Sequence, residues 1–423
     1  MPPSTPETKS LTIGLVLDDG LDAPDGVQQY VLTVARELQA RGHVVHLVAS
    51  TTSRTDLERL HVLGRNLRVR FNGNVLSSPL PARARDLDTL LREVRFDVLH
   101  VQLPHSPFLA GRLVRRVPDD VAVVGTFHIL PESRLVAMGT RGLGLVERRT
   151  LRRFDEVMAV SAPAAEFART SFGVTPRVVT IPVDLGRFST VAAPGEADRP
   201  GPGPHDQAHD EPASADHDDL PRDAHPEPAS AAHDERPLRV VFLGRFVPRK
   251  GPRELVDAAA YVVDHRLVGR PWTLTLAGSG PLDDELRTKV AFEGLTDRVD
   301  MPGFVTEAAK AALLADADLV VLPSTGGESF GISVVEAMAG GGGPVLAGDN
   351  PGYRSTMAGL EEQLVAPRDR VAFGQALARW LLDDDARARA TERQRVAARR
   401  FDVHTVVDEI EATYRRAVAT RRR

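Results

Sequence analysis

The feature that most constrains the fold is a segment, 191–237, which is almost devoid of large apolar residues and divides the chain into two halves. It is rich in Pro, Ala, Asp and His and carries 12 acidic residues against 3 arginines. Within it, 208–215 (Ala-His-Asp-Glu-Pro-Ala-Ser-Ala) recurs with one change at 224–231. Such a segment cannot bury enough surface to offset the entropy of ordering, so we expect it to be a disordered linker. Metal binding by its histidines is the alternative to a solvated insert.

Each half alternates short apolar runs with helical patterns, which is typical of parallel α/β sheets. The predicted strands are 11–17, 44–49, 98–102, 121–127 and 157–160 in the first half, and 238–243, 272–277, 319–322 and 343–347 in the second. We therefore expect an α/β fold with two Rossmann-like doubly wound domains, 1–190 and 238–423, which face a central cleft. The last helix could cross back to the first domain. Such sheets bind ligands beyond the carboxyl ends of their strands, so the cleft is the expected site.

Composition excludes several other classes of protein. The chain of 423 residues has no cysteine, which rules out disulfides and cysteine-based catalysis. No run reaches the roughly 18 apolar residues of a membrane span, and the N-terminus lacks a signal-peptide pattern. We expect a cytoplasmic location, with a peripheral contact at the inner face of the cell membrane left open. The acidic net charge of −5 is set by 191–237, and no nucleic-acid partner is expected.

A glycine-bearing turn with two glutamates, 326–339, carries the strongest chemical signal. It follows the strand 319–322 and reads Gly-Gly-Glu-Ser-Phe-Gly-Ile-Ser-Val-Val-Glu-Ala-Met-Ala. A strand that leads through a glycine turn into a helix offers free backbone N–H groups to an anion. The carboxylates of Glu328 and Glu336 can accept hydrogen bonds from sugar hydroxyls. The motif indicates a site for a nucleotide-linked sugar.

Basic residues follow the first strand of the second half. Arg245, Arg249 and Lys250 come just past 238–243, where the ligand of a doubly wound sheet lies. Guanidinium forks and a lysine ammonium both suit a diphosphate. A solvated basic turn is the alternative.

Two residues of the first half stand where predicted strands end. Gly26 opens the helix after 11–17 and would let a phosphate approach the backbone, although plain turn geometry also accounts for it. His128 follows 121–127, from where it can donate to a sugar hydroxyl or assist proton movement. A structural role for this histidine is equally open.

Together these motifs resemble the retaining GT-B glycosyltransferases of family 4. The resemblance rests on Gly-Arg…Arg-Lys-Gly (244–251), Ala-Gly-Ser-Gly-Pro (277–281), Gly-Phe-Val (303–305) and the 326–339 motif. With Asp-Gly-Val-Gln-Gln (25–29) and Thr-Phe-His (126–128), it is most similar to the actinobacterial phosphatidylinositol α-mannosyltransferases, which use GDP-mannose. It spans both halves and leaves out the linker.

The resemblance implies roles for matching residues. It places His128 near the transferred sugar, Arg245 and Lys250 on the diphosphate, and Glu328 on sugar hydroxyls, as the catalytic set. The donor-binding residues that it implies are Gly26, Arg249, Gly278, Val305, Phe330, Gly331, Ile332 and Glu336, with Glu336 on the ribose. The acceptor-binding residues are Gln28, Arg70 and Asn72. No cofactor beyond the nucleotide-sugar co-substrate and no obligatory metal is expected, because preorganised cations offset the charge on the leaving diphosphate.

The chain departs from the family pattern at three places. Asp25 replaces the first glycine of the usual pair before the helix, which leaves the identity of the donor open. Pro-Val-Asp (182–184) shortens the usual Pro-Asn-Gly-Val-Asp loop between the domains, and 340–343 is a run of four glycines instead of the more typical Ala-Gly-Thr.

A basic amphipathic helix in the first half bears on the acceptor. Leu87, Leu90 and Leu91 lie among basic residues, so the helix could lie on anionic lipid or be an ordinary solvated helix. The basic residues are Arg65, Arg68, Arg70, Arg83, Arg85, Arg92 and Arg95. Our hypothesis is an enzyme that transfers mannose from GDP-mannose, with retention, to a phosphatidylinositol-type lipid. The alternatives are a family-4 transferase with a UDP-sugar donor or with a small inositol or polysaccharide acceptor, and a catalytically silent nucleotide-sugar-binding protein.

Overall fold

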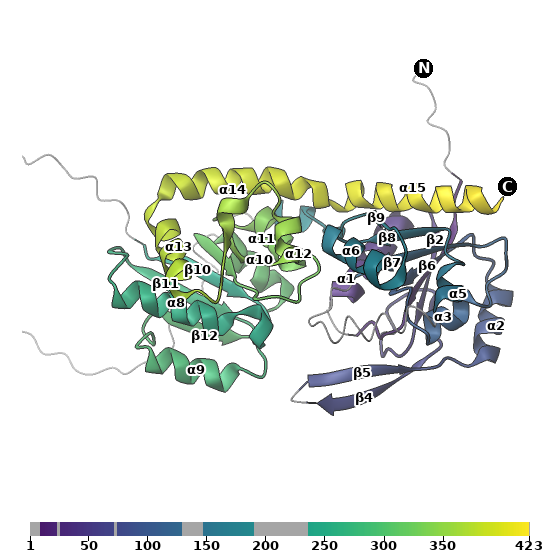
Figure 1. The fold of residues 1–423 in the computed structure, drawn as a ribbon, viewed down its shortest axis with the longest axis horizontal. Coiled ribbons are helices and arrows are strands. Elements are labelled where there is room, and N and C mark those ends of the chain that lie inside the picture. Colours follow the sequence, from purple (N-terminus) through teal and green to yellow (C-terminus); the bar gives the residue numbers. More distant parts are fainter. Residues whose placement is uncertain (1–8, 23–25, 72–73, 129–146, 190–235, 423) are drawn as a thin grey trace, which may run out of the picture.

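The computed structural model describes residues 9–22, 26–71, 74–128, 147–189 and 236–422, with the side chains of 65–71 and 74–79 left out. The described chain forms two α/β domains that lie side by side, and a pair of long helices runs along both (Figure 1). Asn72, an expected acceptor contact, and Asp25 lie outside the described residues, as does nearly all of the predicted linker.

The N-terminal domain is built on a parallel sheet in the order β3-β2-β1-β6-β7-β8-β9. Its strands are β1 (Thr12–Leu17), β2 (Val44–Ala49), β3 (Leu60–Val62), β6 (Val98–Gln102), β7 (Ala122–Phe127), β8 (Glu156–Ala159) and β9 (Arg177–Val178). Its helices include α1 (Gly26–Ala40), α2 (Ala84–Glu93), α3 (Leu109–Val114), α5 (Arg148–Leu151) and α6 (Ala162–Phe172). The strand order reverses between β1 and β6, and such a switch point opens a crevice at the carboxyl ends of the strands.

An antiparallel hairpin stands apart from this sheet. It consists of β4 (Arg65–Phe71) and β5 (Asn74–Leu80), which pair only with each other in the described chain. It is absent from the strands predicted above, although Leu67, Val69 and Phe71 alternate with polar residues in β4, as in a strand with one apolar face. Arg70, an expected acceptor contact, lies in β4 opposite Val75.

The C-terminal domain repeats the architecture with a parallel sheet in the order β12-β11-β10-β13-β14-β15. Its strands are β10 (Leu238–Leu243), β11 (Trp272–Ala277), β12 (Val299–Gly303), β13 (Leu319–Leu322), β14 (Val345–Gly348) and β15 (Leu364–Val365). Its helices are α8 (Pro252–Asp264), α9 (Asp283–Phe292), α10 (Glu307–Ala315), α11 (Ile332–Gly340), α12 (Pro351–Thr356), α13 (Arg370–Leu382) and α14 (Asp384–Ala398). The nine strands predicted from apolar runs are all confirmed, with ends that shift by at most two residues.

Two chain crossings join the domains and hydrogen-bond to each other. The first passes through Val183 to α7 (Gly186–Ser189), and the second leads from α14 into α15 (Val403–Arg421). Val183 N donates to Phe401 O (2.8 Å), and Val403 N donates to Val183 O (3.0 Å). The two crossings are therefore bonded side by side between the sheets.

Helix α15 returns to the N-terminal domain and completes its core. It packs on β7, α1 and β8 and buries Val406, Val407, Ile410 and Tyr414. Figure 1 shows it in line with α14, along the upper edge of both domains.

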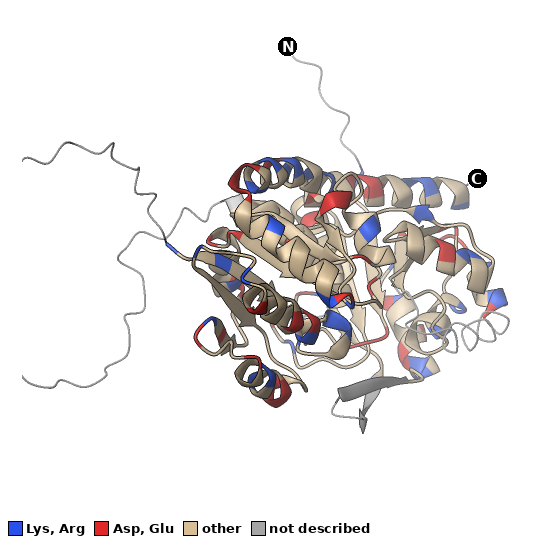
Figure 2. Ribbon diagram, turned by 60° about the vertical axis from the view of Figure 1, so that its left-hand side comes forward, with Lys and Arg blue, Asp and Glu red and all other residues tan. Residues whose placement is uncertain are grey.

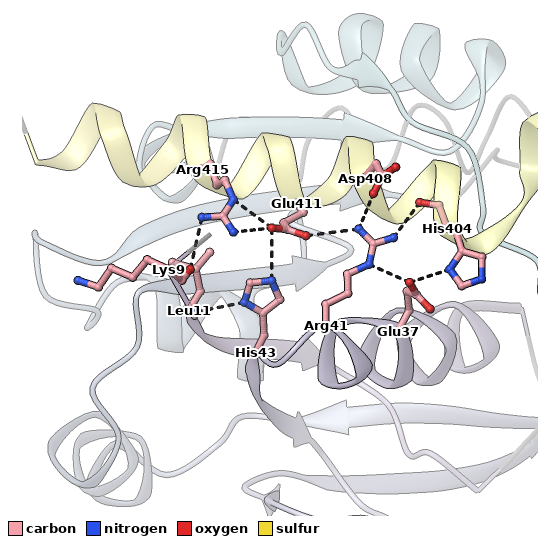
Figure 3. A network of polar contacts seen from close by, with 9 residues as sticks. All are labelled: Lys9, Leu11, Glu37, Arg41, His43, His404, Asp408, Glu411 and Arg415. Carbon is pink, nitrogen blue, oxygen red and sulfur yellow. Dashed lines mark hydrogen bonds and ion pairs between the residues drawn. The ribbon is translucent and has the colours of Figure 1, made fainter. Parts of the chain in front are cut away.

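A polar network fixes α15 to the end of α1 (Figure 3). Arg41 donates to Glu37 Oε1 (2.8 Å), to Asp408 Oδ1 (2.5 Å) and to the backbone oxygen of His404 (2.9 Å). Next to it, His43 Nε2 lies 3.4 Å from Glu411 Oε1. The contacts of Arg41 with Asp408 and with His404 join residues more than 360 positions apart in the chain.

The basic helix expected near the membrane is α2, and its leucines face the protein. Leu87 and Leu90 are buried in the core of the N-terminal domain, whereas Arg85 and Arg92 are exposed. The apolar stripe is therefore not available for insertion into lipid, and only the charged face of α2 could contact a membrane. Charged residues of both signs are spread over both domains (Figure 2). No described helix combines the length and the apolar character of a membrane span.

Candidate active site

A buried carboxylate with two cations forms the centre of the site in the C-terminal domain. Glu328 Oε1 lies 2.7 Å from Arg249 Nη1 and 2.8 Å from Lys250 Nζ. Ser324 Oγ donates to the same oxygen at 3.1 Å. The cations come from the short 3₁₀ helix Pro248–Lys250 that follows β10, and Ser324 comes just after β13. These are the two strands at the switch point of the sheet, where the ligand of a doubly wound fold lies.

The two oxygens of Glu328 differ in their surroundings. Its contacts with described residues all go to Oε1, so Oε2 is left to accept hydrogen bonds from a ligand. Burial alone would raise the pKa of Glu328, but Lys250, Arg249 and Ser324 together hold that pKa below its usual value. Glu328 is therefore ionised at neutral pH.

The turn between β13 and α11 has a shape that only glycine allows. Gly331, which precedes the first residue of α11, has φ 108°. A Cβ at this position would lie 2.5 Å from Cε1 of Tyr353, so a larger residue would collide with a buried ring. The turn brings Glu328 close to the N-terminal end of α11, where unpaired N–H groups favour an anion.

Glu336 lies on α11, one turn farther into the helix, and is paired with a lysine. Lys310 Nζ, from α10, donates to Glu336 Oε1 at 2.9 Å. Burial raises the pKa of Glu336, against the opposing effect of Lys310. Glu336 and Ile332 line a cavity of 460 Å³ between the domains, whose opposite wall includes Tyr30 and Arg36 of α1.

The N-terminal ends of α1 and α11 meet across the domain interface. A Cβ added to Gly26, the first residue of α1, would lie 3.3 Å from Ile332 Cδ1, on the first residue of α11. Both helices carry a partial positive charge at this end. The two domains thus direct helix N-termini at one region beside Glu328.

His128 lies across the cleft, directly after β7. It is 5% exposed, and its Nε2 donates to Gln102 Oε1 at 2.6 Å. The ring of Tyr30 packs edge-on against it, with centroids 4.8 Å apart. Burial lowers the pKa of His128 to about 3, so the ring is neutral at neutral pH. It therefore suits hydrogen bonding better than proton donation by an imidazolium.

The other predicted residues fall into two groups. Gly278 lies against the turn after β10, because a Cβ on Gly278 would collide with Gly244 O. The N–H of Gly278 donates to Gly303 O, two residues before Val305. Arg245 is exposed beside them. The ring of Phe330 instead packs edge-on against Phe401. Its backbone oxygen is also occupied, by Thr356 Oγ1.

Gln28, the remaining described acceptor residue, is buried at the start of α1. Its Nε2 donates to Asp19 Oδ2 at 3.3 Å. Its Oε1 is buried without a hydrogen-bond partner among the described residues. A buried acceptor that lacks a partner has a cost, so this atom is a candidate for contact with a ligand hydroxyl.

Comparison with known proteins identifies the family. The model for "Glycosyltransferase Family 4" matches residues 24–187, and the model for "Glycosyl transferases group 1" matches residues 224–397. A phosphatidyl-myo-inositol mannosyltransferase of Mycobacterium leprae (strain TN) is 30% identical over 408 residues, which cover 96% of each chain. The protein belongs to glycosyltransferase family 4. A further relative of this family-4 glycosyltransferase is the D-inositol 3-phosphate glycosyltransferase of Gordonia bronchialis, which is 26% identical over 93% of this chain and 84% of its own.

Solved structures confirm the GT-B fold of this glycosyltransferase. A glycosyltransferase from Rickettsia africae ESF-5 superposes with a TM-score of 0.67 at 14% identity and covers 97% of this chain and 99% of its own. Anabaena Alr3699/HepE, in complex with UDP and glucose, gives a TM-score of 0.64 at 18% identity and covers 95% and 99% of the two chains.

Two residues of the glycosyltransferase site were not found in the sequence. Gln102 ends β6 and could have been found by the rule that indicated His128, because it too stands at the carboxyl end of a strand. Lys310 gave no such signal, since its contact with Glu336 joins two helices and can be seen only in the fold.

Proposed function

We propose that this glycosyltransferase transfers mannose from GDP-mannose, with retention of configuration, to a phosphatidylinositol-type lipid. The observation that carries the proposal is the convergence of two helix N-termini and a cation cluster beside the carboxylate of Glu328, whose contacts with described residues all go to Oε1. The identity of 30% with a phosphatidyl-myo-inositol mannosyltransferase, over nearly the whole of both chains, supports the choice of donor and acceptor.

In this proposal the diphosphate of the donor lies between α1 and α11. The cations nearby are Arg245, Arg249 and Lys250, and among the described residues the carboxylate that contacts Arg249 and Lys250 is that of Glu328. As the glycosidic bond breaks, negative charge grows on the diphosphate, and these groups stabilise it. The protein cations take the role that a metal ion has in other transferases, so we infer that no metal is required.

The two glutamates share the remaining parts of the donor. Glu328 Oε2 accepts from hydroxyls of the sugar, and Glu336 accepts from hydroxyls of the ribose. In each glutamate a lysine holds Oε1, which fixes the orientation of the carboxylate and leaves the other oxygen for the ligand. Such prior fixing reduces the entropy that is lost on binding.

The acceptor enters from the N-terminal domain, where Gln28 and His128 stand at the edge of the sheet. The inositol ring presents hydroxyls, which suit Gln28 Oε1, an acceptor without a partner among the described residues. The acceptor hydroxyl attacks on the face that the diphosphate leaves, and the diphosphate itself can receive the proton. Retention follows from this geometry without a carboxylate nucleophile.

The direct test is turnover with defined substrates. The purified protein is incubated with radiolabelled GDP-mannose and phosphatidylinositol vesicles, with and without EDTA, and the lipid product is analysed for anomeric configuration by NMR. We expect an α-mannosyl lipid at equal rates with and without EDTA. Thermal shifts with GDP, UDP and ADP compare the nucleotides. Stabilisation by UDP alone would overturn the donor assignment, whereas GDP binding without turnover of any donor would indicate a silent binding protein.

A further inference from the structure

Neighbouring strands β6 and β7 end in polar side chains that are bonded to each other. Gln102 is the last residue of β6, and His128 follows directly after the last residue of β7. Gln102 is paired with Thr126 in the sheet, so Gln102 and His128 lie on the same face. His128 Nε2 lies 2.6 Å from Gln102 Oε1. An amide oxygen can only accept, so Nε2 must carry the ring proton.

This bond leaves the second ring nitrogen as an acceptor. A neutral imidazole has one N–H, so Nδ1 carries a lone pair when Nε2 is protonated. Nδ1 of His128 is buried and has no hydrogen-bond partner among the described residues, and the same holds for Nε2 of Gln102. The pair therefore offers one buried acceptor and one buried donor, which is the combination that a hydroxyl group can satisfy.

His100, two residues before Gln102 on the same strand, shows the contrast. Its Nδ1 lies 2.7 Å from Tyr414 Oη and its Nε2 lies 2.7 Å from Thr126 Oγ1. Both of its nitrogens are thus occupied within the core, as expected of a structural histidine. His128 has the same burial but only one occupied nitrogen, so packing alone does not account for it.

We propose that Gln102 is a positioning residue, which holds His128 in the tautomer with the proton on Nε2. In this tautomer Nδ1 accepts a hydrogen bond from a hydroxyl of the transferred sugar. The inference rests on the proposed function, which places His128 beside that sugar. The groups that face the ring are Tyr30 from α1 and His100 from β6, and both are uncharged at neutral pH.

The tautomer can be read without any substrate. Long-range ¹H–¹⁵N NMR of the ¹⁵N-histidine-labelled full chain distinguishes the two ring nitrogens, with His128→Gln used to assign the signal. We expect wild-type His128 to show a proton on Nε2 alone. Gln102→Leu removes the acceptor and should give a mixture of tautomers, whereas the control Gln363→Leu, a buried glutamine of the other domain, should leave the signal unchanged. A proton on Nδ1 in the wild type would overturn the proposal.

The second part of the test measures activity with GDP-mannose and phosphatidylinositol vesicles. Loss of one correctly placed acceptor should lower kcat/KM of Gln102→Leu about tenfold. Gln102→Glu keeps an acceptor for His128, but its negative charge raises the pKa of His128. The kcat/KM of this variant should therefore fall at acid pH, where His128 becomes protonated, and recover at high pH. The kcat/KM of the wild type should show no such fall. The proposal would also be overturned if Gln102→Leu and the wild type showed the same tautomer of His128 and the same kcat/KM. If the wild type turns over no donor, the proposed function fails, and the NMR result still decides whether Gln102 sets the tautomer.

Discussion

Gly26 and Ile332, the first residues of α1 and α11, face each other across the domain interface, so closely that a methyl group on Gly26 would lie 3.3 Å from Ile332 Cδ1. Gly26→Val should therefore hold the two helix ends apart and weaken binding of the donor diphosphate. We expect KM for GDP-mannose to rise by at least about tenfold, with little change in melting temperature. Gly269→Ala is the control, because no atom lies within 4 Å of a Cβ at that position. An unchanged KM in Gly26→Val would contradict the interdomain donor site.

Glu328→Gln removes the charge that Arg249 and Lys250 share while it keeps the size of the side chain. We expect kcat to fall by at least about 100-fold, because the cations lose their fixed position and the sugar loses a charged acceptor. Stability should fall by about 1.5–3 kcal/mol, as for hydrogen bonds to charged groups, measured by urea unfolding. Glu166→Gln, on an exposed ion pair with Arg169, serves as the comparison. Activity near the wild-type level would remove Glu328 from the donor site.

The N-terminal domain should lose stability in acid. Burial lowers the pKa of His100 and His128 to about 3 and that of His105 to about 4. The unfolded chain binds these protons near pH 6.5, so it is favoured as pH falls from about 6.5 toward the folded pKa values. Each histidine contributes a slope of about 1.4 kcal/mol per pH unit in that window.

Urea unfolding at pH 7.5, 6 and 5 measures this slope. His105→Phe should reduce it by one histidine, since the ring of His105 stacks on Phe127 and Phe172 and a phenyl ring keeps that packing. The depressed pKa of Glu328 gives a loss in the same direction, but only below about pH 4.3, which is lower than any pH in this series. Stability that stays level from pH 7.5 to 5 would rule out three neutral buried histidines.

Arg41→Ala should loosen α15 from α1, because Arg41 joins Glu37, Asp408 and the backbone of residue 404 (Figure 3). We expect a loss of about 1–3 kcal/mol and faster trypsin cleavage within α15. Arg354→Ala removes an arginine from an exposed pair with Asp349 and should leave stability nearly unchanged. Equal losses in the two variants would show that the network adds nothing beyond a surface ion pair.

The periodic parts of this fold could be predicted from the sequence, and the reasons are physical. Strands buried on both faces leave continuous apolar runs, so β1, β10 and β13 were found, and the turn 326–331 was found because its glycines precede a helix. The hairpin β4–β5 was not predicted, because Leu67, Val69 and Phe71 alternate with polar residues and form no continuous apolar run. Pairs such as Glu336–Lys310 and His128–Gln102 depend on which elements become neighbours, and a single sequence does not contain that information.

The sequence also indicated the chemical character of a residue more readily than the direction in which its side chain points. The motif predicts the backbone of Phe330 beside the donor, and only the fold shows that its ring packs against Phe401 beside the connection between the domains. The leucines of α2 fit a lipid surface and a protein core equally well, and only the fold shows that Leu87 lies in the core.

The return of α15 to the first domain has a consequence for biosynthesis. The N-terminal sheet lacks the cover of Val407, Ile410 and Tyr414 until the ribosome has made the entire second domain. The C-terminal sheet and its helices, in contrast, come from one continuous stretch, 236–398. Although its first residues emerge earliest, the N-terminal domain is therefore the last to be completed, which reverses the usual order in which domains fold during translation.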